Sequence, residues 1–144
     1  MTSRAEKPKV LLVDDDHNFA SDCRTWLARE GFCTQAVGVG QAAIQRYRLY
    51  RPYDAVILDL HMPKVDGFQV LREIKRADAR AKVAVLTGDG SARDNAVALG
   101  ADAFVVKPVG RETVCKLVRT LVNNANNSTK EVQAGALIDE TEEF

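Results

Sequence analysis

Six polar residues that could do chemistry stand directly after apolar runs of the sequence. They are Asp14, Asp15, Asp16, Asp59, Thr87 and Lys107. Two or three carboxylates packed at one site repel each other and require a cation. Oxygen ligands without a nearby cluster of histidine or cysteine suit Mg²⁺, which keeps several waters and takes a few carboxylates. A lysine and a hydroxyl beside such a site can hold phosphoryl oxygens, so that a carboxylate can act as the nucleophile and form an aspartyl phosphate.

The apolar runs that carry these residues alternate with segments of helical periodicity. The runs predict five strands, at residues 10–13, 32–37, 55–58, 83–86 and 103–106. Apolar residues at helical spacing predict one helix after each strand, and the last two helices cover residues 91–99 and 110–122. Strands that alternate with helices indicate an α/β fold with a doubly wound parallel sheet covered on both faces.

In a doubly wound fold, ligands bind at the carboxyl ends of the strands, near the topological switch point. Polar residues that are far apart in the sequence can therefore converge at one edge of the sheet. Asp59 would end a buried strand because a rigid strand tip aims its carboxylate. A plainer interpretation of each cluster remains open: the aspartates and Thr87 could be helix caps or turn formers, and Lys107 could be a solvated lysine.

Composition limits the other classes of function. The chain has 144 residues, of which 46% are hydrophobic and 28% charged, and this is ordinary for a single globular domain. Its net charge of zero gives no basic field for nucleic acid or anionic membrane, and its apolar runs are too short to span a bilayer. The polar N-terminus lacks the apolar core of a signal peptide. Cys23, Cys33 and Cys115 have no C-x-x-C spacing, which predicts reduced thiols in a cytoplasmic protein.

The composition also predicts where the domain begins and ends. Residues 1–8 are expected to form an N-terminal tail, and residues 9–122 the folded domain. Residues 123–144 contain two Asn pairs followed by acidic residues, with one lysine against five acids. This segment is predicted to be a disordered tail or linker.

Four stretches of the sequence resemble the receiver domain of bacterial two-component response regulators. They are VLLVDDDHNF, VILDLHMPKVDG, VAVLTGD and AFVVKPV, and the resemblance covers roughly residues 8–122. It implies a flavodoxin-like sheet with strand order 2-1-3-4-5, and it implies that Asp59 is the phosphoacceptor. It further implies that Asp14, Asp15 and Asp59 hold Mg²⁺ together with the backbone carbonyl of His61.

The resemblance assigns roles to further residues. Thr87 and Lys107 are expected to contact the phosphoryl group, and Pro108 to follow a cis peptide bond. Phe104 occupies the switch-aromatic position and is expected to turn inward when Thr87 and the loop after it move toward the phosphoryl group. His61 and Asp89 stand two residues after Asp59 and Thr87. Their side chains are expected to border the phosphoryl pocket and to tune the lifetime of the phosphate.

The expected partners follow from the same resemblance. The phosphodonor is a histidine kinase or a phosphotransfer protein, and phosphorylation switches the surface formed by residues 91–99, 103–106 and 110–122. That surface would bind a downstream protein target, an output domain absent from this sequence or, as a homodimer, a second copy. Direct binding of this segment to nucleic acid or membrane is not expected.

An enzymatic alternative is a small aspartyl-phosphate phosphatase of the haloacid-dehalogenase type. Asp14 and Asp16 are spaced faintly like the D-x-D motif of that family. The alternative also needs a second acidic pair late in the chain and usually a cap insertion, and the sequence shows neither. It leaves the residues from Asp59 to Gly67 without an explanation.

Overall fold

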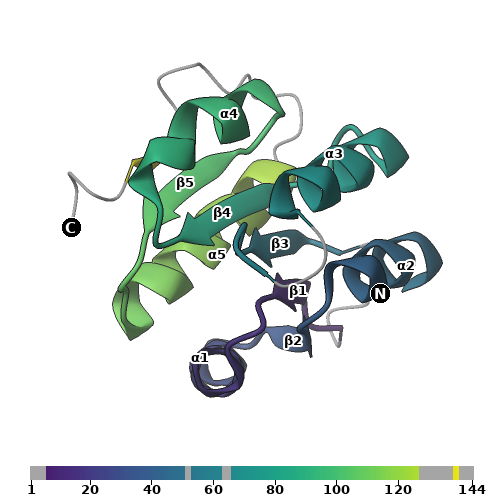
Figure 1. Cartoon of the computed structure of the whole chain (residues 1–144). Helices are drawn as coiled ribbons and strands as arrows, with labels where there is room; N and C mark the ends of the chain where they lie inside the picture. The colour runs from purple at the N-terminus through teal and green to yellow at the C-terminus, as the bar shows by residue number, and fades with distance from the viewer. Residues whose placement is uncertain (1–5, 51–52, 63–65, 127–137, 140–144) are drawn as a thin grey trace.

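A parallel sheet forms the centre of the structure, a computed structural model that describes residues 6–50, 53–62, 66–126 and 138–139 (Figure 1). Its five main strands are β1 (Lys9–Val13), β2 (Cys33–Val37), β3 (Ala55–Leu58), β4 (Val83–Thr87) and β5 (Ala103–Val106). They lie in the order β2-β1-β3-β4-β5, and every neighbouring pair is parallel. The predicted fold and strand order are confirmed.

The apolar runs are continuous because helices bury both faces of the sheet. Along β1, Leu11 and Val13 point into one apolar cluster, whereas Val10 and Leu12 point into the other. All four side chains are inaccessible to solvent. Successive residues of a strand point to opposite faces, so a strand covered on both sides needs apolar residues at every position. β2 lies at an edge and is only partly buried, which accounts for its more polar sequence.

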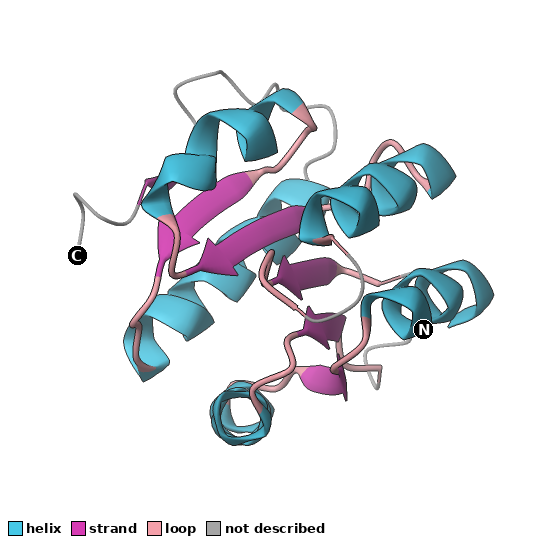
Figure 2. Cartoon of the chain, viewed as in Figure 1, coloured by secondary structure: helices cyan, strands magenta, loops and turns pink. Residues whose placement is uncertain are grey.

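Five α-helices of the described residues cover the sheet, and Figure 2 draws the helices in cyan. They are α1 (His17–Arg29), α2 (Gly40–Tyr50), α3 (Gly67–Ala77), α4 (Arg93–Ala98) and α5 (Arg111–Asn126). Residues of α1 and α5 pack in one apolar cluster, and residues of α2, α3 and α4 pack in the other. Within the described part of the chain, no helix is long and apolar enough to cross a bilayer.

Local signals set the helix boundaries. Asp16 precedes α1, and its side chain accepts a hydrogen bond from the backbone N–H of Phe19. Gly31 follows α1 with φ at 92°, a left-handed conformation that favours glycine. Asp66 precedes α3, and its side chain accepts a hydrogen bond from the backbone N–H of Phe68. At Gly67, a Cβ atom would lie 2.3 Å from Leu60 Cα, so only glycine fits there.

The helices at the end of the domain differ from the prediction. The expected helix at residues 91–99 is a short 3₁₀ turn (Gly90–Ala92) followed by α4, which ends at Ala98. α5 continues to Asn126, four residues beyond the predicted end of the domain. The prediction followed the apolar stripe, which stops at Val122, but backbone hydrogen bonds carry a helix through polar residues until a breaker intervenes.

A sixth strand was not predicted. β6 (Ile138–Asp139) pairs in parallel with the outer edge of β5, within the segment that was expected to be disordered. That prediction is therefore wrong for residues 123–126, which are helical, and for residues 138–139. Its remaining positions, 127–137 and 140–144, lie outside the described residues, as do residues 1–5 of the predicted N-terminal tail.

All three cysteines are free thiols, in agreement with the prediction. Cys23 and Cys115 are buried, whereas Cys33 is exposed at the start of β2. Burial, followed by the nearby charge of Asp14, raises the pKa of Cys23 to about 12. Burial likewise raises the pKa of Cys115. The two buried thiols are thus protected from deprotonation at neutral pH.

Candidate phosphoryl-transfer site

Asp14 and Asp59 meet at the carboxyl ends of the adjacent strands β1 and β3. Their residues are only 3% and 7% exposed, so two carboxylates lie close together with little access to water. The backbone positions both groups: Asp14 Oδ1 accepts from the N–H of Asp16 at 2.9 Å, and Asp59 Oδ1 accepts from the N–H of His61 at 3.1 Å. A rigid strand tip and a loop amide therefore fix each carboxylate.

Asp15 completes an acidic cluster with these two residues. One carboxylate oxygen from each of Asp14, Asp15 and Asp59 lies within 4.8 Å of the others, and Asp15 is exposed. Hard oxygen donors in this number, open to solvent on one side, can share a divalent cation that retains water ligands. Burial raises the pKa of Asp14, and the hydrogen bond from Lys107 offsets part of that effect.

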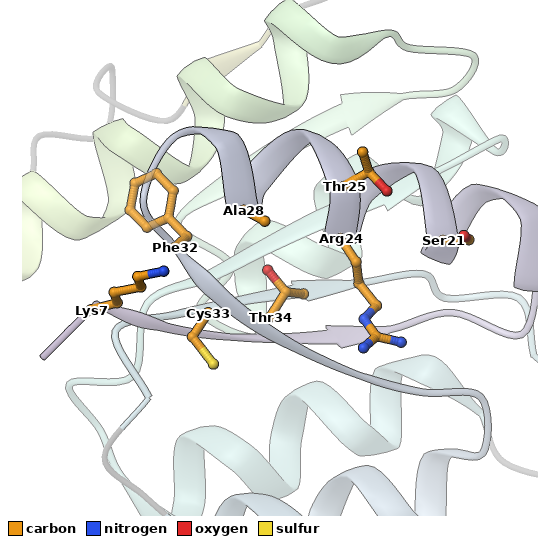
Figure 3. Close-up of a pocket in the computed structure, with 8 residues that line it drawn as sticks. All are labelled: Lys7, Ser21, Arg24, Thr25, Ala28, Phe32, Cys33 and Thr34. Atoms are coloured by element: carbon orange, nitrogen blue, oxygen red, sulfur yellow. The ribbon is translucent and has the colours of Figure 1, made fainter.

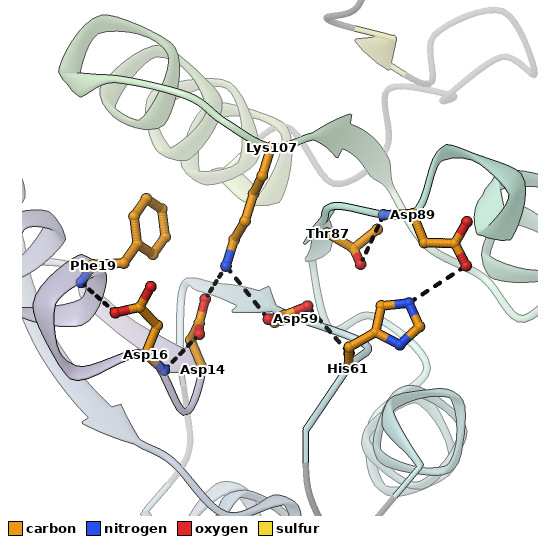
Figure 4. Close-up of polar contacts among 8 residues, drawn as sticks. All are labelled: Asp14, Asp16, Phe19, Asp59, His61, Thr87, Asp89 and Lys107. Atoms are coloured by element: carbon orange, nitrogen blue, oxygen red, sulfur yellow. Dashed lines mark hydrogen bonds and ion pairs between the residues drawn. The ribbon is translucent and has the colours of Figure 1, made fainter.

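Lys107 supplies the positive charge beside the cluster (Figure 4). Its Nζ lies 2.7 Å from Asp14 Oδ2 and 3.4 Å from Asp59 Oδ2. The same Nζ lies 4.6 Å from the centre of the Phe19 ring. Burial disfavours the ammonium, but the hydrogen bond and charge of Asp14, with those of Asp59, outweigh it and raise the pKa of Lys107. The lysine is charged at neutral pH and is held by the carboxylates that follow β1 and β3 and by a ring of α1.

Thr87 ends β4 and is completely buried. Its Oγ1 accepts a weak hydrogen bond from the backbone N–H of Asp89 at 3.4 Å. Phe104, on the neighbouring strand β5, is 1% exposed and packs in the cluster that contains Ala92 and Ala96. From the sequence we expected the Phe104 ring to turn inward only after phosphorylation. In this structure the ring already lies inward. The peptide bond between Lys107 and Pro108 is cis.

The side chains of His61 and Asp89 make a polar contact between the loops that follow β3 and β4. His61 Nε2 lies 3.4 Å from Asp89 Oδ2, and the side chains are 63% and 41% exposed. Hydrogen bonds from Ser91, followed by the interaction with His61, lower the pKa of Asp89. Figure 4 shows this pair on the side of Thr87 away from Lys107. The sequence indicated that His61 and Asp89 border the phosphoryl pocket separately, whereas in the structure the two side chains contact each other.

Comparison with known proteins identifies the family. Residues 10–119 match the response regulator receiver domain. The chain belongs to this family. Among relatives of this receiver domain, the transcriptional regulatory protein AfsQ1 of Streptomyces coelicolor is 33% identical over 134 residues, which are 91% of this chain and 59% of that protein. The matched part of the chain spans only 20%, 48% and 54% of the length of three other curated relatives.

Solved structures agree with this assignment. A CheY-like receiver domain protein from Methanospirillum hungatei has a TM-score of 0.80 at 18% identity, over 85% of this chain and 99% of that chain, which shows the shared fold. The response regulator TrrA from Thermotoga maritima, solved in complex with Mg(2+)-BeF, has a TM-score of 0.73 at 30% identity. That match covers 79% of this chain and 98% of the TrrA chain.

Three features of this site were missed in the sequence. The Phe19 ring contacts Lys107, although its helical spacing indicated only a core position. The His61 amide orients Asp59, and Gly67 lets α3 begin against the backbone of Leu60. Two signals were available: an aromatic residue one turn into the helix after the acidic run, and the Asp-Gly pair at the start of α3.

A cavity of about 480 Å³ lies elsewhere, between α1 and β2 (Figure 3). It is lined by Lys7, Ser21, Arg24, Thr25, Ala28, Phe32, Cys33 and Thr34. Several of these residues stand at the amino ends of β1 and β2, whereas the acidic cluster lies at the carboxyl ends. The Thr34 hydroxyl is buried and has no hydrogen-bond partner among the described residues. The cavity contributes no residue to the site around Asp59.

Proposed function

We propose that this receiver domain accepts a phosphoryl group on Asp59 from a histidine kinase or a phosphotransfer protein. One observation carries the proposal. The buried Asp59 carboxylate lies 3.4 Å from the Lys107 ammonium, and its oxygen groups with those of Asp14 and Asp15 within 4.8 Å. This arrangement combines a fixed nucleophile, a fixed cation and oxygen ligands for a metal at one strand edge.

In the proposed transfer, a carboxylate oxygen of Asp59 attacks the phosphorus atom of the donor. An acyl phosphate forms while the phosphorus–nitrogen bond of a phosphohistidine breaks, and the released imidazole keeps the electron pair and takes up a proton. The Lys107 ammonium stabilises negative charge on the phosphoryl oxygens. The Thr87 hydroxyl, at the end of the next strand, donates a hydrogen bond to one of them.

The acidic cluster fits Mg²⁺, because it offers hard oxygen donors and an open side where the ion can keep its waters. Asp14, Asp15, Asp59 and the backbone carbonyl of His61 would hold the ion. When bound, Mg²⁺ neutralises charge on the carboxylate and phosphoryl oxygens. The complex of the relative TrrA with Mg(2+)-BeF supports this assignment.

Phosphorylation is proposed to change the surface formed by α4, β5 and α5 through Thr87 and the loop that follows it. Because Phe104 is already inward, the change would alter the packing of that loop against the ring rather than rotate the ring. The surface would then bind a downstream protein, an attached output domain or a second copy of the chain. The family assignment favours this signalling role over the haloacid-dehalogenase alternative, so the only chemistry proposed is transfer to and loss from Asp59.

Phosphorylation with a radiolabelled phosphoramidate or acetyl phosphate tests the proposal. The wild type should take up one phosphoryl group in Mg²⁺ and none in EDTA, and the label should be released by hydroxylamine. Asp59→Asn should remain unlabelled, whereas the control Asp66→Asn should label normally, since asparagine also caps a helix well. Equal labelling of Asp59→Asn, or labelling that is indifferent to EDTA, would remove the basis of the proposal.

A further inference from the structure

The two edges of the sheet differ in the described part of the chain. β2 forms one edge and pairs only with β1, whereas at the other edge β6 covers β5. Ala103 is opposite Ile138, and Phe104 is opposite Asp139. An uncovered strand edge presents a row of unpaired N–H and C=O groups that can pair with another chain. β6 satisfies part of that row from within the same chain.

The position of β6 matters because β5 is the central element of the surface assigned to signalling. Phe104, whose ring is buried beneath α4, is one of the two β5 residues that β6 pairs with. A second copy or a partner that adds a strand to β5 would need the same backbone groups. Two segments cannot pair with one strand edge at once, so β6 and such a partner exclude each other.

The sequence and the charges of the chain are consistent with pairing between β6 and the edge of β5. From Ile138 to the last residue the chain carries four acids and no base, whereas α5, which follows β5, carries three basic residues and one acid. Opposite net charges favour the approach of the segment, and backbone pairing then fixes its register. Proline and glycine, which weaken strands, are both absent from residues 136–144.

We propose that the outer edge of β5 is a docking site for an extended peptide segment, and that β6 (Ile138–Asp139) occupies it in cis. While bound, β6 limits access of a second copy to the surface of α4, β5 and α5. The docking itself stands independently of phosphorylation. Only its consequence for a phosphorylation-dependent dimer rests on the proposed function.

Backbone amide exchange in the full chain tests the docking without metal or phosphodonor. The double variant Ile138→Pro/Asp139→Pro removes both amide donors of β6. Amides of β5 that face β6 should exchange about three- to tenfold faster, as expected for the loss of one or two hydrogen bonds. Amides of β5 that donate to β4 serve as internal references and should not change. The control Val132→Pro/Gln133→Pro places two prolines in the same tail and should leave exchange as in the wild type.

A synthetic peptide of residues 134–144 adds a second arm. Added to the proline variant, it should restore protection of the same β5 amides, whereas a scrambled peptide should not. In sedimentation equilibrium with Mg²⁺ and beryllofluoride, the proline variant should dimerise about three- to tenfold more tightly than the wild type, because its docking edge is free. Unchanged β5 exchange in Ile138→Pro/Asp139→Pro would overturn the proposal. If β5 amides exchange faster in Ile138→Pro/Asp139→Pro but the wild type takes up no phosphoryl group, the docking is upheld. Only the proposed function is then refuted.

Discussion

Replacing Lys107 by methionine should destabilise the metal-free chain by a predictable amount. Its Nζ lies 2.7 Å from Asp14 Oδ2 and 3.4 Å from Asp59 Oδ2. At an effective dielectric constant of about 20, these distances correspond to about 6 and about 5 kcal/mol of attraction before desolvation is subtracted. Removing one partner of a buried ion pair typically costs about 3–5 kcal/mol.

The expected loss is at the lower end of that range. The Lys107 side chain is 21% exposed, so water already screens part of the attraction. We expect Lys107→Met to lower the free energy of unfolding by about 3 kcal/mol, which is about 10 °C in Tm for a domain of this size. Domains are typically stable by about 5–15 kcal/mol, so the variant should remain folded.

Urea denaturation in EDTA, followed by the fluorescence of the single tryptophan, Trp26, measures this loss. Burial already raises the pKa of Asp14, and removing the lysine raises it further. When the pKa of a carboxyl group is raised in the folded state, the ionised group lowers the free energy of unfolding at a pH above that pKa. This loss of stability is relieved as the pH falls and the group takes up a proton. The stability deficit of Lys107→Met should therefore become smaller as the pH falls from neutral toward the ordinary pKa of a carboxyl group.

Two variants make the test specific. Arg48→Met breaks an ion pair with Glu73 in which the arginine is 55% exposed, and it should cost less than about 1 kcal/mol. Asp14→Asn combined with Lys107→Met should show a coupling energy of at least about 1 kcal/mol. If Lys107→Met is as stable as Arg48→Met at every pH and shows no coupling to Asp14, the ammonium does not stabilise the carboxylates as argued.

Three further predictions concern other parts of the domain. Gly67→Ala should lower the free energy of unfolding by about 2 kcal/mol in urea denaturation, because the clash with the Leu60 backbone outweighs the gain of about 1 kcal/mol in helix propensity. An unchanged free energy of unfolding would contradict the close approach of Gly67 to Leu60. Native protein at pH 8 should consume one equivalent of a thiol reagent rapidly, and Cys33→Ser should abolish this rapid reaction. Rapid consumption of two equivalents would contradict the burial of Cys23 and Cys115. His61→Ala and Asp89→Ala should each change the rate of dephosphorylation several-fold. The double variant should change that rate no more than the stronger single variant, because the two side chains contact each other and act together. Additive effects of the two substitutions on the rate would contradict this coupling.

The central sheet could be predicted from the sequence because its physical signal is local and strong. Four of the five strands are apolar at nearly every position, and burial on both faces admits few alternatives. The convergence of Asp14, Asp59 and Lys107 followed from the rule that carboxyl ends of parallel strands share an edge. That rule places residues at an edge but gives no distances between them.

Features that depend on pairing between distant or weakly patterned segments could not be predicted. α4 buries only Ala96, so its apolar pattern was too weak to fix its length. β6 has two residues, and its pairing with β5 is a backbone interaction that leaves no periodic pattern in the sequence. The contact between His61 and Asp89 joins two loops whose relative position only the folded chain defines. The inward ring of Phe104 likewise depends on packing beneath α4.

The most direct test of the account is to locate the phosphoryl group chemically. After labelling in Mg²⁺, borohydride reduces an acyl phosphate of aspartate to homoserine, which remains at the modified position through proteolysis and peptide mass spectrometry. The account predicts homoserine at Asp59 and unmodified aspartate at Asp14 and Asp15. Homoserine at either of those two residues, or a label that borohydride leaves in place on His17 or His61, would contradict the assignment of Asp59 as the phosphoacceptor.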